Sequence, residues 1–382
     1  MPRILISAGE ASGEMYGAAL LGALRKLSPA PVEAFGLGGE QMRAAGCDTV
    51  VDAKDVAVVG IAEVVTHLPR IYREFHNLLR EADRRKPDVA VLIDFPDFHF
   101  RLAKALHARG IPVVYYVSPQ LWAWRRGRIK LVQRYVNKML VIFPFEEQFY
   151  RDHGVAAEFT GHPLAELAVE IEPRQQFAAR HNLDPARPWI ALLPGSRRKE
   201  VQMILPTLLQ AAKILGLQYE YLLPVASTLT ADWMREQLLT IPGAPRVTLT
   251  SDARQTLLQS RAGMVASGTA TVEATVLGTP FVMVYRVAGF SWHVGRRLVK
   301  LSHFAMPNLI AGREIIRELV QQQFTPENVA GEVSKLVEDG ERRNQVIHDL
   351  AEVRSHLQAG RSTESAAERA ARAVLGLANC AH

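Results

Sequence analysis

The chain has 382 residues, 48% of them hydrophobic, and carries a formal net charge of +6. This length is typical of two domains, and so much apolar material excludes a disordered chain. The two cysteines, Cys47 and Cys380, stand far apart, which argues against a disulfide framework or a cysteine-based metal site and fits a reducing compartment. The positive charge suits an acidic partner, namely nucleic acid, phosphorylated metabolites or an anionic membrane face, without choosing among them.

We expect neither a signal peptide nor a membrane-spanning helix. The apolar residues 4–8 are too few for a signal peptide, and Glu10 and Glu14 follow at once. No window of about eighteen residues is apolar and uncharged throughout, as a spanning helix requires. These features predict a cytoplasmic protein.

Short apolar runs alternate with helix-length segments through the first part of the chain. Runs rich in β-branched residues, separated by helices, predict a parallel sheet that is covered on both faces. The strand runs are residues 3–9, 32–39, 88–94, 112–118 and 138–144.

The same alternation starts again after GHPLAELAVEIEPRQQ, a segment with two prolines and alternating charges that predicts a domain boundary near residue 165. From about Thr325 onward the strand runs stop, and we predict a tail of three helices, 326–338, 341–357 and 362–377. The second set of strand runs is residues 189–195, 219–226, 246–251, 262–268 and 280–286.

The fold class is therefore predicted to be α/β, with two doubly wound, Rossmann-like domains and a helical C-terminal tail. Ligands bind such sheets beyond the carboxyl ends of the strands, so two facing sheets would form a cleft between the domains. The alternative is two independent α/β domains joined by a linker.

The stretch LLPGSRRKEV, residues 192–201, predicts a strand, a tight turn and the start of a helix. Amide groups at a helix N-terminus bind anions, Gly195 allows the backbone to come close, and Ser196 can cap the helix. Arg197 and the two cations after it oppose the helix dipole, which indicates an anionic ligand such as a phosphate. The alternative is a capped helix with a solvated basic first turn.

The stretch ASGTATVEATVLGTP, residues 266–280, predicts a second turn of the same kind. Ser267, Gly268 and Thr269 are small hydrogen-bonding residues at a helix start, and Glu273 follows one turn later. A carboxylate there is able to hold the diol of a ribose. The alternative, and by itself the better interpretation, is an ordinary capping glutamate.

Carboxylates also follow two strand runs of the first domain. The stretch SAGEASGEMYG carries Glu10 and Glu14; it lacks the GxGxxG pattern of dinucleotide sites, and carboxylates suit hydroxyl groups better than phosphates. The stretch LIDFPDFHF places Asp94 and Asp97 at a strand end, where either could act as a general base toward an alcohol. Asp97 could instead cap the next helix.

Two further patterns combine aromatic or apolar residues with cations. The stretch SPQLWAWRRGR, residues 118–128, could stack on a ring or hold a phosphate, or could simply pack with a solvated basic edge. Residues 56–75 and 288–304 mix bulky apolar residues with Arg, Lys and His, a pattern suited to an anionic bilayer or a lipid tail. Buried core helices are the better interpretation of either segment alone.

Six motifs, in this order along the chain, resemble the lipid-A-disaccharide synthase family: SAGEASGE, IDFPDF, YYVSPQLWAWR, LPGSRRKEV, ASGTATVEA and MPNLIAGREIIRELVQ. These enzymes are membrane-peripheral glycosyltransferases of lipid A assembly in Gram-negative bacteria. The resemblance implies a GT-B fold with two Rossmann-like domains facing a cleft. An acceptor-binding domain, 1–165, would be joined by the last helix, 360–377, and would be followed by a UDP-sugar-binding domain, 166–355.

The resemblance also implies the reaction. UDP-2,3-diacylglucosamine would condense with 2,3-diacylglucosamine 1-phosphate (lipid X) to give a β-1,6-linked disaccharide 1-phosphate and UDP, with inversion and without a metal or cofactor. The enzyme, a monomer or homodimer, would work in the cytoplasm on an anionic membrane surface, the inner face of the inner membrane.

Residue roles follow from the matching positions. Ser196 and Arg197 would bind the pyrophosphate and Glu273 the ribose. The first choice for the base that takes the proton of the acceptor 6-hydroxyl is Asp97, followed by Asp94 and then Glu14. The complete set of expected donor-binding residues is Ser196, Arg197, Ser267, Gly268, Thr269, Glu273, Asn308, Glu318 and Gln321.

Three rival functions are open to test. A peptidoglycan N-acetylglucosamine transferase or a 2-epimerase would share the fold and the UDP-sugar, but the WAWR stretch and the ordered motifs argue against both. Nucleic-acid binding is disfavoured because Arg and Lys are scattered and no RNP-like or zinc-finger pattern occurs. A non-catalytic lipid-docking scaffold would show no turnover.

Overall fold

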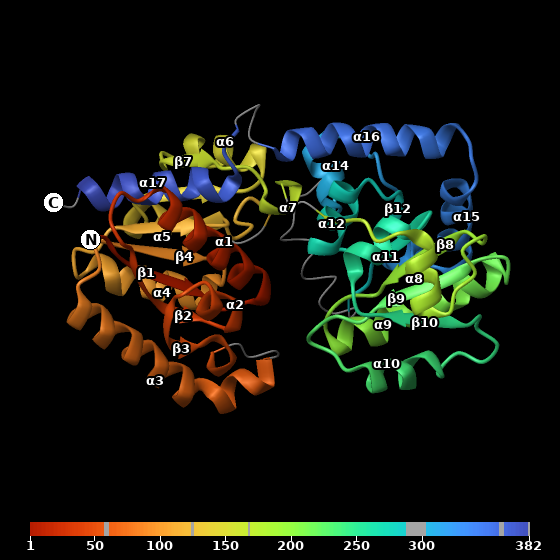
Figure 1. Cartoon of the computed structure of the whole chain (residues 1–382), viewed down its shortest axis with the longest axis horizontal. Coiled ribbons are helices and arrows are strands. Elements are labelled where there is room, and N and C mark those ends of the chain that lie inside the picture. Colours follow the sequence, from red (N-terminus) through yellow and green to blue (C-terminus); the bar gives the residue numbers. More distant parts are fainter. Residues whose placement is uncertain (57–60, 124–125, 167–168, 288–302, 359–362, 381–382) are drawn as a thin grey trace. The chain divides into compact units, whose positions relative to one another are not determined.

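A computed structural model describes residues 1–56, 61–123, 126–166, 169–287, 303–358 and 363–380. The chain divides into two compact units, each built around its own parallel sheet (Figure 1). Unit 1 consists of Met1–Glu166 together with Leu357–His382, and unit 2 of Leu167–His356.

The sheet of unit 1 has seven strands in the order β3-β2-β1-β4-β5-β6-β7, and each neighbouring pair is parallel. Ala8 of β1 pairs with Ile93 of β4, and Ile93 pairs with Tyr116 of β5, so the carboxyl ends of the three central strands lie level. The strands are β1 (Arg3–Ala8), β2 (Glu33–Gly38), β3 (Asp48–Asp52), β4 (Val89–Ile93), β5 (Val113–Tyr116), β6 (Lys138–Val141) and β7 (Ala157–Phe159).

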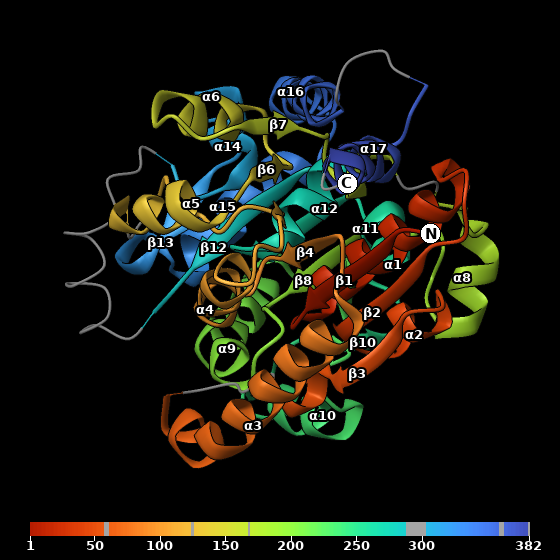
Figure 2. The same ribbon diagram turned by 90° about the vertical axis from the view of Figure 1, so that its left-hand side faces the viewer.

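The last helix of the chain, α17 (Ala366–Cys380), packs on α1 (Ala11–Leu27) within unit 1 (Figures 1 and 2). Small buried residues such as Ala370 and Ala371 allow the two helix backbones to come close, and Lys26 Nζ lies 2.5 Å from Glu368 Oε1. The other helices of unit 1 are α2 (Glu40–Ala44), η1 (Ala53–Asp55), α3 (Ile61–Arg85), α4 (Pro96–His107), η2 (Arg126–Arg128), α5 (Ile129–Tyr135), α6 (Pro144–Asp152) and α7 (Pro163–Glu166).

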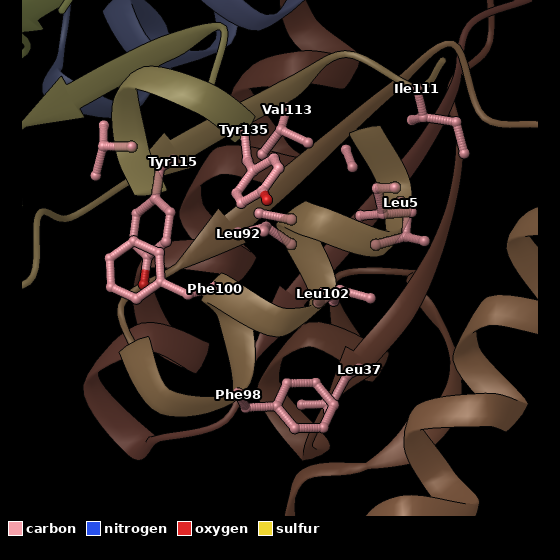
Figure 3. Packing of buried hydrophobic residues seen from close by; sticks show 14 of the residues in the cluster. Leu5, Leu37, Leu92, Phe98, Phe100, Leu102, Ile111, Val113, Tyr115 and Tyr135 are labelled. Atoms are coloured by element: carbon pink, nitrogen blue, oxygen red, sulfur yellow. The ribbon is translucent and has the colours of Figure 1, made fainter. Parts of the chain in front are cut away.

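The core of unit 1 lies between the sheet and its covering helices (Figure 3). Leu92 of β4 and Tyr115 of β5 are fully buried, and Phe100 and Leu102 of α4 pack in the same cluster. Each large apolar side chain that is buried in this way contributes about 1.5–3 kcal/mol. The cluster thereby fixes α4, whose first turn lies at the carboxyl edge of the sheet.

The sheet of unit 2 has six strands in the order β10-β9-β8-β11-β12-β13, again parallel in every pair. Its strands are β8 (Trp189–Leu193), β9 (Glu220–Pro224), β10 (Val247–Thr250), β11 (Ala262–Ala266), β12 (Phe281–Tyr285) and β13 (Glu318–Val320). Its helices are α8 (Arg174–His181), α9 (Arg198–Leu215), α10 (Ala231–Leu238), α11 (Ala253–Gln259), α12 (Thr269–Leu277), α14 (Met306–Ala311), η3 (Gln321–Gln323), α15 (Pro326–Val337) and α16 (Glu341–Leu357).

The predicted fold class is confirmed: two Rossmann-like units carry the strands expected from the apolar runs, and helices follow from residue 326 onward. The third helix of the tail begins at Ala366 rather than at 362. Three strands were not predicted, namely β3, β7 and β13. They are short and only partly buried, so they lack the continuous apolar run that marks a central strand.

Candidate active site

The turn between β8 and α9 combines a positive-φ glycine with an internal carboxylate. Gly195 has φ 115°, a conformation that strongly favours glycine, and a Cβ at that position would also displace the Glu200 carboxylate. The Ser196 N–H donates to Glu200 Oε2 at 3.0 Å, and the Thr228 hydroxyl donates to the Ser196 carbonyl at 2.5 Å. The turn is thus held from both sides, with one of its backbone amides aimed at a negative charge.

Ser196 does not cap α9 with its side chain, contrary to the expectation from the sequence. The residue at the cap position is Arg197, whose side chain makes no capping hydrogen bond. The difference arises because Glu200, in the first turn, reaches back to the Ser196 amide and supplies the carboxylate that a helix N-terminus favours.

The three cationic side chains at this turn, Arg197, Arg198 and Lys199, are exposed. The Arg198 guanidinium lies 5.3 Å from the centre of the Trp233 ring and is therefore already engaged. Within the described part of the chain, neither Arg197 nor Lys199 has an ion-pair partner. These two side chains are available to an anion that approaches the start of α9.

The turn between β11 and α12 lies directly beside the first one, because Val265 of β11 pairs with Leu193 of β8. Gly268 stands at the cap position with φ 140°, and nothing lies within 4 Å of where its Cβ would be. The amides of a first helical turn, here those of Thr269 and Ala270, have no acceptor within the helix. Ser267 extends the pairing of β11 with β12, because its N–H donates to the Val284 carbonyl at 3.0 Å.

Glu273 lies in the body of α12 and faces the start of α11. Its Oε1 lies 3.5 Å from Arg254 Nε, and its side chain is mostly buried. Burial raises the pKa of the Glu273 carboxyl, and the Arg254 guanidinium opposes that shift. A carboxylate held in this way keeps acceptor capacity for a hydroxyl group.

Asn308 and Glu318 are joined to each other and to the backbone. Asn308 is fully buried; its amide nitrogen donates to Glu318 Oε1 at 2.7 Å and to the Ile316 carbonyl at 2.8 Å, and its Oδ1 accepts two amides, from Ile315 and Ile316. Glu318 also accepts the amides of Phe304 and the residue after it, at the start of α14. The two predicted donor residues therefore shape the chain between β13 and α14, and all four hydrogen-bonding positions of Asn308 are used.

Gln321 follows β13 and has a left-handed backbone, with φ 52°. Its side-chain amide donates to the Val287 carbonyl at 3.1 Å. Gln321 is only partly buried and directly follows β13, at the edge of the sheet that β12 and β13 reach with their carboxyl ends.

At the carboxyl edge of unit 1, Asp94 directly follows β4. Both Asp94 and Phe95 have left-handed backbones, with φ 49° and 50°. Burial and, secondarily, the negative charge of Glu10 raise the pKa of the Asp94 carboxyl to about 7. Asp94 therefore titrates near neutral pH, which is where a general acid or base is most effective.

Asp97 lies in the first turn of α4, and its side chain is 74% exposed. Arg128 Nη2 donates to Asp97 Oδ1 at 2.5 Å. The cap position of α4 belongs to Phe95, so the alternative that Asp97 is the N-cap of this helix is wrong. The carboxylate faces solvent at the same sheet edge as Asp94.

Glu14 lies in the first turn of α1, and its carboxylate is used inside unit 1. Its Oε1 accepts the Gln41 amide at 2.6 Å, and its carboxylate contacts Gly39 where any Cβ would clash. Glu14 therefore caps the short helix α2, which is a structural role that the sequence did not suggest.

A buried carboxyl that the sequence did not single out holds the SPQLW loop. Trp122 Nε1 donates to Glu146 Oε1 at 3.0 Å, and the Phe143 amide donates to Oε2 at 3.2 Å. Glu146 is fully buried, and burial raises its pKa to about 7. Its only sequence signal is its place three residues after Phe143, the position of a capping glutamate in α6.

Several predicted contacts fall outside the described residues. They include Val58, Val59, the second tryptophan of the WAWR stretch and most of the segment 288–304. Of the segment 56–75, α3 exposes Leu68 (46%) and Tyr72 (67%). Within the described parts of the chain, every helix is too short or too polar to cross a bilayer.

Comparison with solved structures identifies the fold. The structure of CalG4, the calicheamicin glycosyltransferase, matches with a TM-score of 0.60 at 17% identity and covers 99% of this chain and 98% of its own. A UDP-GlcNAc 2-epimerase from Neisseria meningitidis, bound to UDP-GlcNAc, matches with a TM-score of 0.67 at 13% identity over 98% of this chain and 100% of its own. The two Rossmann-like units thus form a GT-B glycosyltransferase fold.

Relatives found by sequence share far more identical residues with this chain than these solved structures do. A lipid-A-disaccharide synthase of Koribacter versatilis (strain Ellin345) is 81% identical over 99% of both chains. One from Acidobacterium capsulatum is 53% identical over 93% of this chain and 92% of its own. The model of the lipid-A-disaccharide synthetase family matches residues 4–374. The chain therefore belongs to this glycosyltransferase family and has a role in lipid A biosynthesis.

Proposed function

We propose that the protein transfers 2,3-diacylglucosamine from its UDP conjugate to the 6-hydroxyl of 2,3-diacylglucosamine 1-phosphate, giving a β-1,6 disaccharide 1-phosphate and UDP. Membership of the family supports the class of reaction and its place in lipid A biosynthesis. The observation that carries the proposal is the pair of glycine turns at Gly195 and Gly268, side by side on one sheet edge, each opening a helix N-terminus.

The pyrophosphate would lie at these two turns. Helix N-termini attract anions through unpaired amides and the helix dipole, and both α9 and α12 begin there. Arg197 and Lys199 are exposed beside them. As the bond between the anomeric carbon and UDP breaks, negative charge develops on the leaving diphosphate, and these groups would stabilise it.

The nucleoside would extend from the turns toward α11 and η3. Glu273 would accept hydrogen bonds from the ribose hydroxyls, and Gln321 would offer its carbonyl oxygen. Asn308 and Glu318 would act less directly, because their hydrogen bonds already hold the chain at the start of α14. Ser267 and Thr269 would complete the donor site next to the phosphates.

On the acceptor side, a carboxylate of unit 1 would take the proton of the 6-hydroxyl as its oxygen attacks the anomeric carbon. Attack from the face opposite to UDP inverts that carbon in a single displacement. Asp97 is the first choice because its carboxylate is exposed at the sheet edge. Asp94 is the second because its pKa of about 7 suits a base at neutral pH. Glu14 is the third, since its carboxylate already caps α2.

The acylated substrates place the reaction at a lipid surface, which we propose to be the cytoplasmic face of the inner membrane. The exposed Leu68 and Tyr72 of α3 stand close in sequence to Arg70 and Arg73, the mixture that an anionic bilayer surface attracts. This surface would admit the acyl chains without a membrane-spanning segment.

The direct test is incubation of the protein with UDP-2,3-diacylglucosamine and lipid X, with release of UDP and formation of disaccharide measured together. UDP-N-acetylglucosamine in place of the acylated donor is the control. Turnover of the acylated pair alone supports the proposal. UDP release or epimerisation with the unacylated sugar, and none with the acylated pair, would overturn it and favour an enzyme of peptidoglycan or amino-sugar metabolism.

A further inference from the structure

The backbone turn formed by Asp94 and Phe95 after β4, called the corner below, is strained. It is held by a chain of hydrogen bonds between buried side chains, called the relay below. Asp94 and Phe95, both non-glycine, stand one after the other in the left-handed region. Such residues cost about 1–3 kcal/mol each and persist only where their surroundings hold them. Here the Asp94 carbonyl accepts two hydrogen bonds, from the Tyr115 hydroxyl at 2.6 Å and from His99 Nδ1 at 2.6 Å.

The direction of the relay follows from chemistry. His99 is fully buried, and burial lowers its pKa to about 4, so the imidazole is neutral at neutral pH. Its Nδ1 faces a carbonyl, which only accepts, so Nδ1 carries the proton and Nε2 must accept. The Ser7 hydroxyl, 2.7 Å from Nε2, is then the donor. The chain of hydrogen bonds runs from Ser7 on β1 through His99 on α4 to Asp94.

The relay fixes where the carboxyl groups of this edge point. The Phe95 ring packs against Gly9 so closely that a Cβ on Gly9 would lie 2.4 Å from the ring. The corner is therefore in contact with the turn after β1. Pro96 and Asp97 follow at once as the first turn of α4, and the His99 amide donates to the Phe95 carbonyl at 3.0 Å. If the corner relaxed, the carboxyl groups of Asp94 and Asp97 would both move.

We infer that His99 is a positioning residue for glycosyl transfer: its Nδ1–H, oriented by Ser7, holds the left-handed corner that presents Asp94 and Asp97 to the acceptor hydroxyl. This inference rests on the proposed function for its effect on rate. Its structural half, the hydrogen bond from His99 Nδ1 to the Asp94 carbonyl, stands without it.

Two amide substitutions separate the two ends of the imidazole. In His99→Asn the amide nitrogen lies near the place of Nδ1 and can still donate to the Asp94 carbonyl. In His99→Gln it lies near the place of Nε2 and can reach only Ser7. We expect His99→Asn to keep kcat within about threefold, and His99→Gln to lower kcat roughly 10- to 100-fold with both KM values little changed, because misplacement of a reacting group costs rate rather than binding.

Ser7→Ala provides a second, independent test of the relay. In the wild-type background it removes the donor that fixes the imidazole, and we expect a loss of kcat. In the His99→Asn background the relay no longer needs Ser7, so the same substitution is expected to have no further effect on kcat. Equal effects of Ser7→Ala in both backgrounds would contradict the relay.

Amide hydrogen exchange at residues 94–98 tests the corner without any turnover. His99→Gln is expected to speed exchange there, and His99→Asn is not. The thermal midpoints of both variants serve as the control, because each substitution changes one buried hydrogen bond. If His99 had only a structural role, kcat and the exchange rate would change in parallel with the midpoint in both variants. That parallel change, or equal kcat in the two variants, overturns the inference. Absence of turnover by the wild-type protein would instead refute the proposed function.

Discussion

The Glu200 carboxylate accepts the backbone N–H of Ser196 at 3.0 Å and lies against Gly195, whose φ of 115° favours glycine. A negative charge of the protein thus occupies part of the turn at which we place the pyrophosphate. Tyr285, whose pKa is raised by burial and by the charge of Glu200, lies on the same side. An incoming diphosphate must share the amide with Glu200 or displace it.

We therefore expect Glu200→Gln to bind UDP more tightly than the wild type, by roughly three- to tenfold. The substitution removes one negative charge from the turn and leaves an amide whose oxygen can still accept the Ser196 N–H. Isothermal calorimetry with UDP measures the change. Glu332→Gln, which changes a partly buried glutamate of α15 that pairs with Lys335, is the matched control. Weaker UDP binding by Glu200→Gln would show that Glu200 assists the ligand.

Arg197→Ala is expected to weaken UDP binding roughly 10- to 100-fold, because a hydrogen bond to a charged phosphate contributes about 1.5–3 kcal/mol. Its neighbour provides the control: in Arg198→Ala the lost guanidinium lies over Trp233, so UDP affinity is expected to change little. The same calorimetric titration compares the two variants. Equal losses would mean that the site responds to overall charge and not to Arg197 in particular.

Asp97→Ala is expected to lower disaccharide formation by more than about 100-fold while leaving the thermal midpoint unchanged, because its side chain is 74% exposed. Asp83→Ala is the matched control, since Asp83 of α3 is also exposed and paired with an arginine. If activity of Asp97→Ala stays within about tenfold, or 1.4 kcal/mol of barrier, then Asp97 is not the base. Asp94→Asn, assayed in parallel, then tests the second candidate.

The central strands of both sheets could be predicted because parallel strands are buried on both faces and read as continuous apolar runs. The edge strands β3, β7 and β13 could not, since charged residues such as Asp48 and Glu318 interrupt the apolar pattern. The turns after β8 and β11 were also visible in the sequence, because their glycines mark positions where the chain must adopt a positive φ.

The partners of the carboxylates could not be predicted. Glu14 accepts the amide of Gln41, and Ser7 donates to His99, which is 92 positions away in the sequence. Both contacts arise from the order and register of the parallel strands, which place residues of separate strand–helix segments at one edge. A sequence shows that a carboxylate follows a strand, but the three-dimensional register decides whether it meets a substrate or a helix N-terminus.

The buried Glu146 makes the stability of unit 1 depend on pH with a defined sign. Its pKa is about 7 in the folded chain and 4.5 as the ordinary value, so between these limits the folded state holds a proton that the unfolded chain has lost. The contribution of Glu146 to the free energy of unfolding is full below about pH 4.5 and decreases as the pH rises to about 7, by roughly 1.4 kcal/mol per unit of pKa shift.

Glu146→Gln removes this titration but keeps a polar group beside Trp122. We expect the thermal midpoint of the variant, relative to the wild type, to rise steadily as the pH is raised from about 4.5 to about 7, whatever the offset at acidic pH. Glu147→Gln, one position further along α6, changes a solvent-accessible glutamate paired with Arg151 and is expected to follow the wild-type curve. Parallel curves for wild type and Glu146→Gln across this range would mean that the Glu146 carboxyl is already ionised in the folded protein, with the Trp122 and Phe143 N–H groups stabilising its charge despite burial.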